Sequence, residues 1–337
     1  METAGVLKKI SFKKHNFKGV RTHDPRHNEI TLRLLAETVA VFVLLSVSAY
    51  HLLKIENFWA TVLYCGVLLF QGLWLDRLYI VGHEATHKKL FPNSAFTNDL
   101  AGMLMLMPLL VPLRIYRKIH AFHHGFNRKD HHTSVLDVFV TKKPLNIFKK
   151  AWFYFLWFAG VFLGGYFIHS IVSIVLFLLT PTALAVKISP AFKGWTIKDK
   201  VVSWAQFSLG IGFHYIVFAT FGFDAWLAAL GLPFLVFAWV WSLLVYIFHY
   251  DTTIGPDVRY NARSLKRNPF FAWLFMNFNE HATHHAKPNI PWYELPLKKV
   301  DLPEGFQKNQ NVETVFQAIK QQLKGPIIIH EHDHQES

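Results

Sequence analysis

The sequence predicts an all-α, polytopic membrane protein with about four transmembrane helices, re-entrant or interfacial helices, and a cytoplasmic cap. Three observations predict this fold class: 52% of the 337 residues are hydrophobic, the apolar residues stand in long blocks, and Lys and Arg cluster beside those blocks. Long apolar blocks indicate contact with a bilayer, because a soluble core uses short periodic runs instead. The formal charge of +13 then fits loops that meet anionic lipid, and it does not indicate nucleic-acid binding.

Two hairpins account for the four predicted crossings. Residues 32–53 and 58–80 each come near the ~20 residues that a spanning helix requires, and only a few polar residues join them. Residues 201–222 and 225–248 form the second hairpin, joined near Asp224 without any Lys or Arg. Both hairpins therefore return the chain to the side from which it entered.

Two further apolar stretches are predicted not to cross. Residues 100–113 are too short to span comfortably and contain Pro108 and Pro112, which favours a re-entrant or interfacial element. Residues 151–180 have lysines at both ends and glycines within, so this block is expected to fold back. Those residues are Lys142, Lys143, Lys149 and Lys150 before it, Lys187, Lys193, Lys198 and Lys200 after it, and Gly160, Gly164 and Gly165 inside it.

The charge pattern also predicts sidedness and organisation. Both termini are expected to be cytoplasmic, with a basic segment over residues 1–31, a membrane domain over 32–305, and a tail over 306–337 that contains an amphipathic helix. The basic segment has no apolar core, so it does not form a cleavable signal peptide. Cys65 is the single cysteine, which excludes a disulfide framework, a Cys-based zinc site and an iron–sulfur cluster.

Three histidine clusters, each near the end of an apolar stretch, are the main functional signal. They are His83-Glu-Ala-Thr-His87, His120-Ala-Phe-His123-His124 and His281-Ala-Thr-His284-His285. Spacings of three and four residues place side chains on one face of a helix, so each cluster presents its imidazoles together. The topology puts all three clusters on the cytoplasmic side, where they can share one site.

The number of imidazoles predicts two redox-active metal ions. Imidazole suits iron, copper, nickel and zinc, and one zinc ion takes about four ligands, so eight are too many for a single ion. Shared between two iron ions, they leave open positions for oxygen species. His249, at the end of the last apolar block, is the expected ninth ligand. The predicted metal ligands are therefore His83, His87, His120, His123, His124, His249, His281, His284 and His285.

Other polar residues are expected in supporting positions. Ligating histidines usually donate their second N–H to a carboxylate or carbonyl. The favoured partners are Asn277, Asn279 and Asp137, with Glu84, Asp99, Asp251 and Glu280 as further candidates. Seven further histidines have other expected roles: His131 and His132 as solvated residues, His169 and His214 as helix contacts, and His330, His332 and His334 in a disordered end.

These clusters resemble, in order and spacing, the three histidine boxes of the membrane fatty acid desaturase superfamily. The stretch Asn289-Ile-Pro-Trp-Tyr-Glu-Leu-Pro296 is similar to the segment that follows the third box in many lipid desaturases, and Tyr246-Ile-Phe-His249 to the segment that supplies an extra ligand. The resemblance spans roughly residues 32–296 and implies a site with two iron ions that uses O2 to remove hydrogens from a lipid hydrocarbon chain. No His-Pro-Gly-Gly motif of a fused cytochrome b5 is present in the sequence. The resemblance thus implies a separate electron donor of the ferredoxin or cytochrome b5 type.

The expected function is an O2-dependent oxidoreductase that desaturates fatty acyl chains. Hydroxylation, carotenoid ketolation and oxidative decarboxylation begin with the same hydrogen abstraction, so the histidine pattern leaves them open. A rival interpretation takes His83-Glu84-x-x-His87 as an intramembrane zinc protease with Glu84 as general base. It leaves most of the clustered histidines unexplained. A metal transporter would instead place polar residues along the middles of several helices.

Overall fold

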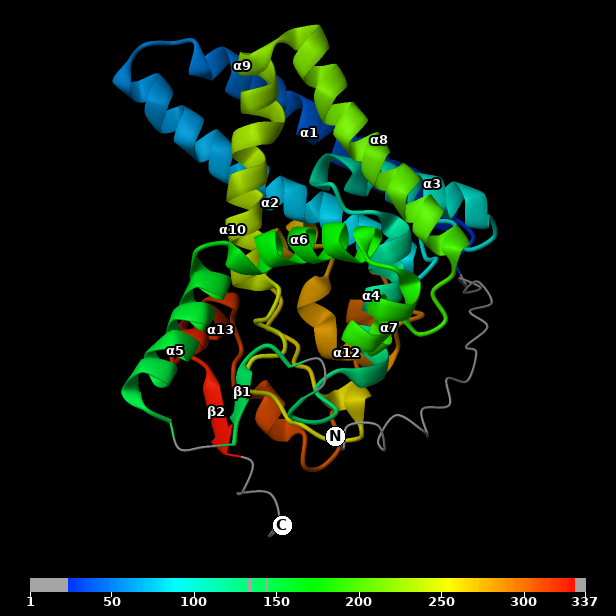
Figure 1. Ribbon diagram of the computed structural model, residues 1–337. Coiled ribbons are helices and arrows are strands. Elements are labelled where there is room, and N and C mark those ends of the chain that lie inside the picture. Colours follow the sequence, from blue (N-terminus) through cyan, green and yellow to red (C-terminus); the bar gives the residue numbers. More distant parts are fainter. Residues whose placement is uncertain (1–23, 133–134, 143–144, 331–337) are drawn as a thin grey trace.

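Four long apolar helices form the membrane part of the computed structural model, which describes residues 24–132, 135–142 and 145–330 (Figure 1). They are α1 (His27–Leu53), α2 (Phe58–Thr86), α8 (Ile197–Phe221) and the stretch Phe223–Leu244. The last consists of α9 (Phe223–Trp226), a π-helical turn (Leu227–Gly231) and α10 (Leu232–Leu244). Each is long and apolar enough to cross a bilayer, which confirms the predicted number of crossings.

Local sequence explains where these helices begin. The Asn57 side chain accepts a hydrogen bond from the Ala60 amide at the start of α2, and Thr196 and Asp199 form a capping box at the start of α8. Large apolar side chains then point outward, including Leu44, which is 64% exposed, and Trp59, which is 76% exposed. Such a surface is stable only against lipid, so the chain is an integral membrane protein.

Two helix pairs bend sharply where the sequence predicts that the chain does not cross. The pair α3 (Ala95–Leu106) with its 3-10 turn Met107–Leu109 and α4 (Leu113–Phe126) bends by 96°. The pair α5 (Ile147–Phe162) and α6 (Gly165–Leu179) bends by 89° at Gly164, whose φ of +81° favours glycine. Neither block forms one straight spanning helix.

Short helices and a small sheet form a cap at one end of the long helices, drawn in the lower half of Figure 1. Its α-helices are α7 (Thr182–Ile188), α11 (Pro269–Leu274), α12 (His281–Ala286) and α13 (Val315–Gln322). The 3-10 turns in this part are Pro190–Phe192, Val258–Tyr260, Phe278–Glu280, Leu295–Leu297 and Gln307–Gln310. Strand β1 (Val138–Thr141) pairs in parallel with β2 (Ile327–His330).

The tail differs from its predicted form. The expected amphipathic helix is α13. Strand β2 is an additional element that local sequence does not predict, because parallel strands pair across a long stretch of chain. The tail also packs on the rest of the chain: the Trp157 indole N–H donates to the Gln322 carbonyl over 2.9 Å, and the Tyr250 hydroxyl donates to the Gly325 carbonyl over 2.7 Å. His330, which was expected in a disordered end, is the last residue of β2, whereas residues 1–23, His332 and His334 lie outside the described residues.

Helix ends shift at three places that matter for the histidines. Helix α1 begins at His27 and not at residue 32. Helix α2 continues past residue 80 to Thr86, so the first histidine cluster lies on the end of a spanning helix. Helix α10 ends at Leu244, so His249 lies in turns beyond the helix, where the sequence pattern placed it at the helix end.

Candidate metal site

The nine predicted ligands converge from four segments. The end of α2 supplies His83 and His87, α4 supplies the second cluster, the loop after α10 supplies His249, and α12 supplies the third cluster. Their ligand atoms form two groups, and within each group these atoms lie within 4.8 Å of one another. The five-histidine group comprises His83, His87, His120, His124 and His284, and the four-histidine group comprises His123, His249, His281 and His285.

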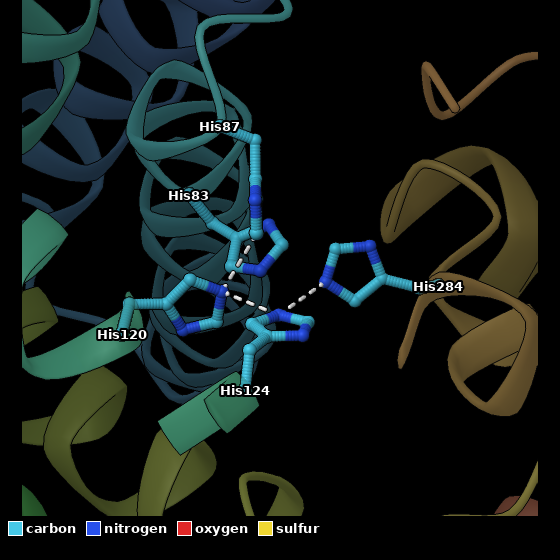
Figure 2. Close-up of side chains that lie close together, drawn as sticks. All are labelled: His83, His87, His120, His124 and His284. Atoms are coloured by element: carbon cyan, nitrogen blue, oxygen red, sulfur yellow. Dashed lines mark hydrogen bonds between the residues drawn. The ribbon is translucent and has the colours of Figure 1, made fainter. Parts of the chain in front are cut away.

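The five-histidine group joins three helices around a common centre. The Nε2 atom of His120 lies 2.8 Å from that of His87 and 3.0 Å from that of His124, and the His124 and His284 Nε2 atoms are 3.0 Å apart. The His83 ring lies 4.3 Å from the His120 ring, centroid to centroid. Figure 2 shows His284 approaching from the side opposite α2 and α4.

The four-histidine group likewise brings Nε2 atoms from different segments close together. The Nε2 atoms of His123 and His285 are 3.2 Å apart, and those of His249 and His281 are 3.0 Å apart. The His123 and His249 rings stand 4.8 Å apart and nearly perpendicular. Each helix that contributes to this group also contributes to the first, so the two groups are neighbours.

The arrangement of nitrogen atoms fits a metal ion better than hydrogen bonding. An imidazole Nε2 has one in-plane position, which holds either a proton or a lone pair. The His120 Nε2 atom approaches two other Nε2 atoms, so it cannot satisfy both through one position. A cation at the centre can use all the lone pairs together. The residues therefore fit a metal site.

Burial prepares these imidazoles for ligation. It lowers the pKa of His249, His281, His284 and His285 well below the usual 6.5, and the neighbouring histidines add to this effect. A neutral imidazole has the free lone pair that a metal requires. The histidines are thus neutral at physiological pH and ready to bind.

The backbone turn before α12 orients the third histidine cluster toward the other ligands. Helix α12 is only six residues long, and the chain enters it through Met276 and Asn277, which both have left-handed φ angles, of 53° and 56°. The Asn277 amide donates to the Trp292 carbonyl over 3.2 Å. The Pro-Trp-Tyr segment therefore braces the turn that aims α12 at the other histidines.

A buried ion pair supports the first cluster, and only one of its two residues was predicted from the sequence. Glu84 was a predicted neighbour of the ligands, and its Oε1 lies 3.3 Å from His83 Nδ1 and 2.9 Å from Lys89 Nζ. Lys89 is 1% exposed and donates to the Ile290 carbonyl over 2.9 Å. The signal for Lys89 was weak, because a lysine after an apolar helix usually indicates a solvated loop. Glu84 is itself 2% exposed and ion-paired, which does not suit the general base of a zinc protease.

The other predicted supporting residues lie near the site but bind other groups. Asn279 donates to the Leu265 carbonyl and to Glu280, and Asp137 accepts from the Tyr246 hydroxyl and the Asp251 amide. Among the further candidates, Asp99 pairs with Arg117, Glu280 pairs with Lys299, and the Asp251 carboxylate contacts Gln321. In the described part of the chain, Glu84 is the one residue among these whose carboxylate lies close to a clustered histidine, 3.3 Å from His83 Nδ1.

The isolated histidines differ from the clustered ones. His214 contacts the Pro108 carbonyl through Nε2 at 2.9 Å and accepts from the Trp226 indole N–H through Nδ1 at 3.3 Å, which confirms its predicted role as a helix contact. His169 has an exposed side chain on α6. Neither joins the two groups of ligand atoms.

Comparison with known proteins adds an independent observation. A family model described as fatty acid desaturase matches residues 57–316. An sn-1 oleoyl-lipid 12-desaturase of Anabaena variabilis is 26% identical over 265 residues, which cover 71% of this chain and 68% of the relative. An enzyme of the same name from Synechocystis is 22% identical, with coverages of 79% and 76%. An sn-1 acyl-lipid omega-3 desaturase (ferredoxin) of Synechocystis is 26% identical, with coverages of 67% and 64%.

Proposed function

This chain belongs to the fatty acid desaturase family, and from that premise we propose that it is an acyl-lipid desaturase with two iron ions. It is an oxidoreductase, as its desaturase relatives are. The names of all three relatives specify acyl chains carried on a lipid, which supports a lipid-linked substrate here as well. Hydroxylation, ketolation and decarboxylation remain alternative outcomes of the same hydrogen abstraction.

The division of nine histidines into groups of five and four carries the proposal of two ions. The nine ligands are the five-histidine and four-histidine groups in full. When bound, the two iron ions would supply, with O2 as co-substrate, the oxidising power to remove two hydrogens from adjacent methylene groups. A methylene C–H bond is too weakly acidic for acid–base catalysis, and zinc has no redox chemistry, which favours iron.

The chain's own residues would position the site and exclude water. His83 lies on the spanning helix α2, whose C-terminal half is buried against α1, α3 and α10. The two metal groups therefore lie at the end of the membrane part of the fold. A hydrocarbon chain could thus reach them from the bilayer without entering water. The buried Glu84–Lys89 pair would hold the His83 ring by contact with its Nδ1 atom.

The electron donor would be a separate protein. One relative carries ferredoxin in its name, which supports a ferredoxin-type donor for this chain, with a cytochrome b5-type protein as the alternative. The lysines that flank the apolar segments favour a cytoplasmic location for the cap, the metal site and both termini. The donor would then approach from the cytoplasm.

The decisive experiment is mass spectrometry coupled to gas chromatography, applied to lipids and hydrocarbons from cells that express the wild type or His284→Ala. The cells should co-express ferredoxin and its reductase, so that electrons are supplied. We expect unsaturated acyl chains in the lipid fraction of the wild type alone. Hydroxylated, oxo or terminally unsaturated products would keep the metal site but reassign the reaction, and the absence of any product despite bound iron would contradict the proposal.

A further inference from the structure

His249 differs from the other ligands because no helix carries it. The other eight lie in a helix or directly at its end, whereas His249 stands five residues beyond the end of α10 in a run of turns. Its carbonyl accepts from the Thr252 hydroxyl over 2.9 Å, and Asp251 has a left-handed φ of 57°. A left-handed φ is uncommon outside glycine, although Asp adopts it more readily than most residues, so the contacts around Asp251 help to fix this turn.

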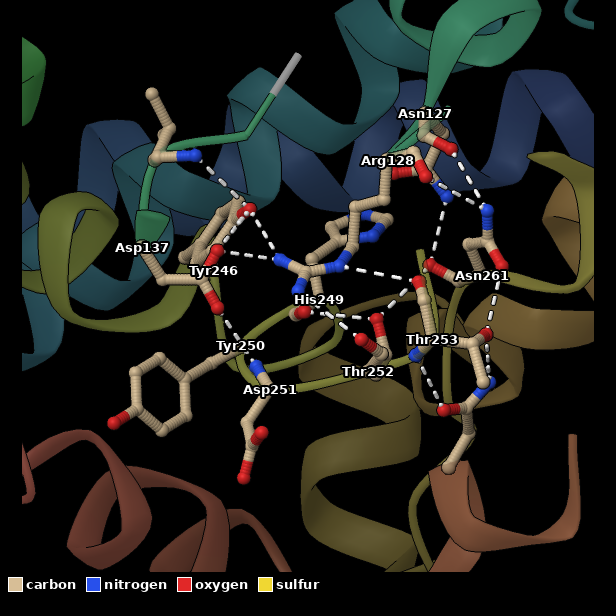
Figure 3. Close-up of polar contacts among 12 residues, drawn as sticks. Asn127, Arg128, Asp137, Tyr246, His249, Tyr250, Asp251, Thr252, Thr253 and Asn261 are labelled. Carbon is tan, nitrogen blue, oxygen red and sulfur yellow. Dashed lines mark hydrogen bonds and ion pairs between the residues drawn. The ribbon is translucent and has the colours of Figure 1, made fainter. Parts of the chain in front are cut away.

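Asp137 fixes this turn from both sides of His249 (Figure 3). One carboxylate oxygen, Oδ1, accepts from the Tyr246 hydroxyl over 3.0 Å, and the other, Oδ2, accepts from the Asp251 amide over 2.8 Å. These groups lie three residues before and two residues after His249. Asp137 is 0% exposed, so neither bond competes with water.

Arg128 connects the same turn to α4. It follows the end of that helix by two residues, forms an ion pair with Asp137, and is 1% exposed. Its guanidinium donates to the Tyr246 hydroxyl over 2.9 Å and to the carbonyls of Thr252 and Thr253 over 3.0 and 3.3 Å. The planar guanidinium thus binds both ends of the turn at fixed positions.

Asn261 adds a second connection between the same two segments. Its amide donates to the Arg128 carbonyl over 3.0 Å, and its carbonyl oxygen accepts from the Thr253 hydroxyl over 2.7 Å. Asn261 is fully buried. Because Arg128 itself has a left-handed φ of 47°, this bond also fixes the backbone through which the chain leaves α4.

We propose that Arg128, Asp137 and Tyr246 form a clamp that positions His249 opposite His123, and that this clamp determines whether the four-histidine group binds its metal ion. His123 lies on α4, five residues before Arg128, and its ring stands 4.8 Å from that of His249. The clamp is distinct from the ligands, since its hydrogen bonds go to the backbone and the hydroxyl around His249. The inference rests on the proposed function only for the identity of the two metal ions.

The clamp should act on one metal group and spare the other. The five-histidine group takes all its members from α2 with its final turn, α4 and α12, none of which needs the clamp for its helical shape. The four-histidine group includes His249. A general contribution of the ion pair to stability would instead weaken both groups equally, which makes metal stoichiometry the informative measurement.

The test compares iron bound per chain in the purified wild type, Asp137→Asn, Tyr246→Phe and His249→Ala. Asparagine keeps the shape of Asp137 but removes the charge. We expect the iron content of Asp137→Asn, like that of His249→Ala, to be about one ion per chain, against about two in the wild type. Mössbauer spectra should show loss of the two-iron signal in both variants. Tyr246→Phe removes only a hydroxyl, and we expect about 10-fold weaker binding of the second ion, the lower end of the 10- to 100-fold range for groups that orient ligands.

Glu37→Gln is the matched control. Glu37 pairs with the buried Arg77 between α1 and α2 and accepts from the Trp273 indole N–H, so this variant also removes the charge of a carboxylate paired with arginine. We expect it to retain about two iron ions at wild-type affinity. Size-exclusion chromatography in detergent and the thermal midpoint show which variants fold.

Each outcome bears on the proposal. The clamp is overturned if Asp137→Asn binds two iron ions at wild-type affinity, or if it loses iron equally from both histidine groups. A wild type that binds fewer than two iron ions also overturns it. If Asp137→Asn does not fold, the affinity of Tyr246→Phe for the second ion decides the matter. A wild type that binds two ions but forms no unsaturated lipid contradicts the proposed function alone, because the clamp is judged by metal binding.

Discussion

Gly102 of α3 lies so close to Ala85 of α2 that a Cβ atom on the glycine would stand 2.3 Å from the alanine Cβ. Ala85 lies between the two histidines of the first cluster. We expect Gly102→Ala to force α3 away from α2 and to destabilise the fold by about 1–3 kcal/mol, as overpacking does. The thermal midpoint and the iron content of the purified variant measure the effect.

Gly66→Ala provides the control for that substitution. Gly66 lies on the same spanning helix, α2, and has no atom within 4 Å of an added Cβ. We expect an unchanged iron content and a thermal midpoint at least as high as that of the wild type. Equal losses in the two variants would show that the close contact with Ala85 is not responsible.

Lys89→Met tests the buried ion pair beside the first cluster. The substitution leaves the Glu84 carboxylate buried without its cationic partner, which costs about 3–5 kcal/mol in comparable buried pairs. The double variant Glu84→Gln with Lys89→Met removes both charges, so we expect it to recover most of that loss. Thermal unfolding of the metal-free proteins measures the difference, and a double variant as unstable as Lys89→Met would contradict a paired role.

Single alanine substitutions should separate the clustered histidines from the isolated ones. We expect His123→Ala and His284→Ala, one from each group of ligand atoms, to lose iron and to form no detectable product. His51→Ala changes an exposed histidine in the last turn of α1 and should alter neither quantity. Iron analysis and lipid chromatography of the three variants provide the measurement. Wild-type iron in both ligand variants would refute the assignment.

Acid should destabilise the metal-free protein. Burial keeps the pKa of His281, His284 and His285 below the usual 6.5, so the unfolded chain binds more protons than the folded chain once the pH falls below that value. Stability is therefore full above about pH 6.5 and declines toward lower pH, by up to about 1.4 kcal/mol per pH unit for each such histidine. We expect the thermal midpoint to fall between about pH 7 and about pH 5.

The variant His285→Ala supplies the comparison for this pH effect. It lacks one buried histidine of low pKa, so its thermal midpoint should depend less steeply on pH than that of the wild type. Equal slopes would indicate that other groups dominate the acid response. Iron release should follow the same direction, because ligation requires the neutral imidazole.

The eight histidines of the three clusters and the four long apolar helices could be predicted because each depends on local sequence. Apolar runs of about 20 residues specify spanning helices by length alone, and spacings of three and four residues place His120, His123 and His124 on one helical face. The bend at Gly164 was likewise signalled by a glycine within an apolar block. Such patterns can be recognised without knowledge of any distant part of the chain.

Only the tertiary structure decided which histidines belong together and what holds them. The second cluster divides, with His120 and His124 in one group and His123 in the other, because helical rotation turns neighbouring side chains toward different partners. The bonds of Asp137 to Tyr246 and Asp251 cross more than 100 residues of sequence, as does the pairing of β1 with β2. Sequence period specifies the direction of a side chain within its own helix, but the groups that meet it are chosen by the packing of the whole chain.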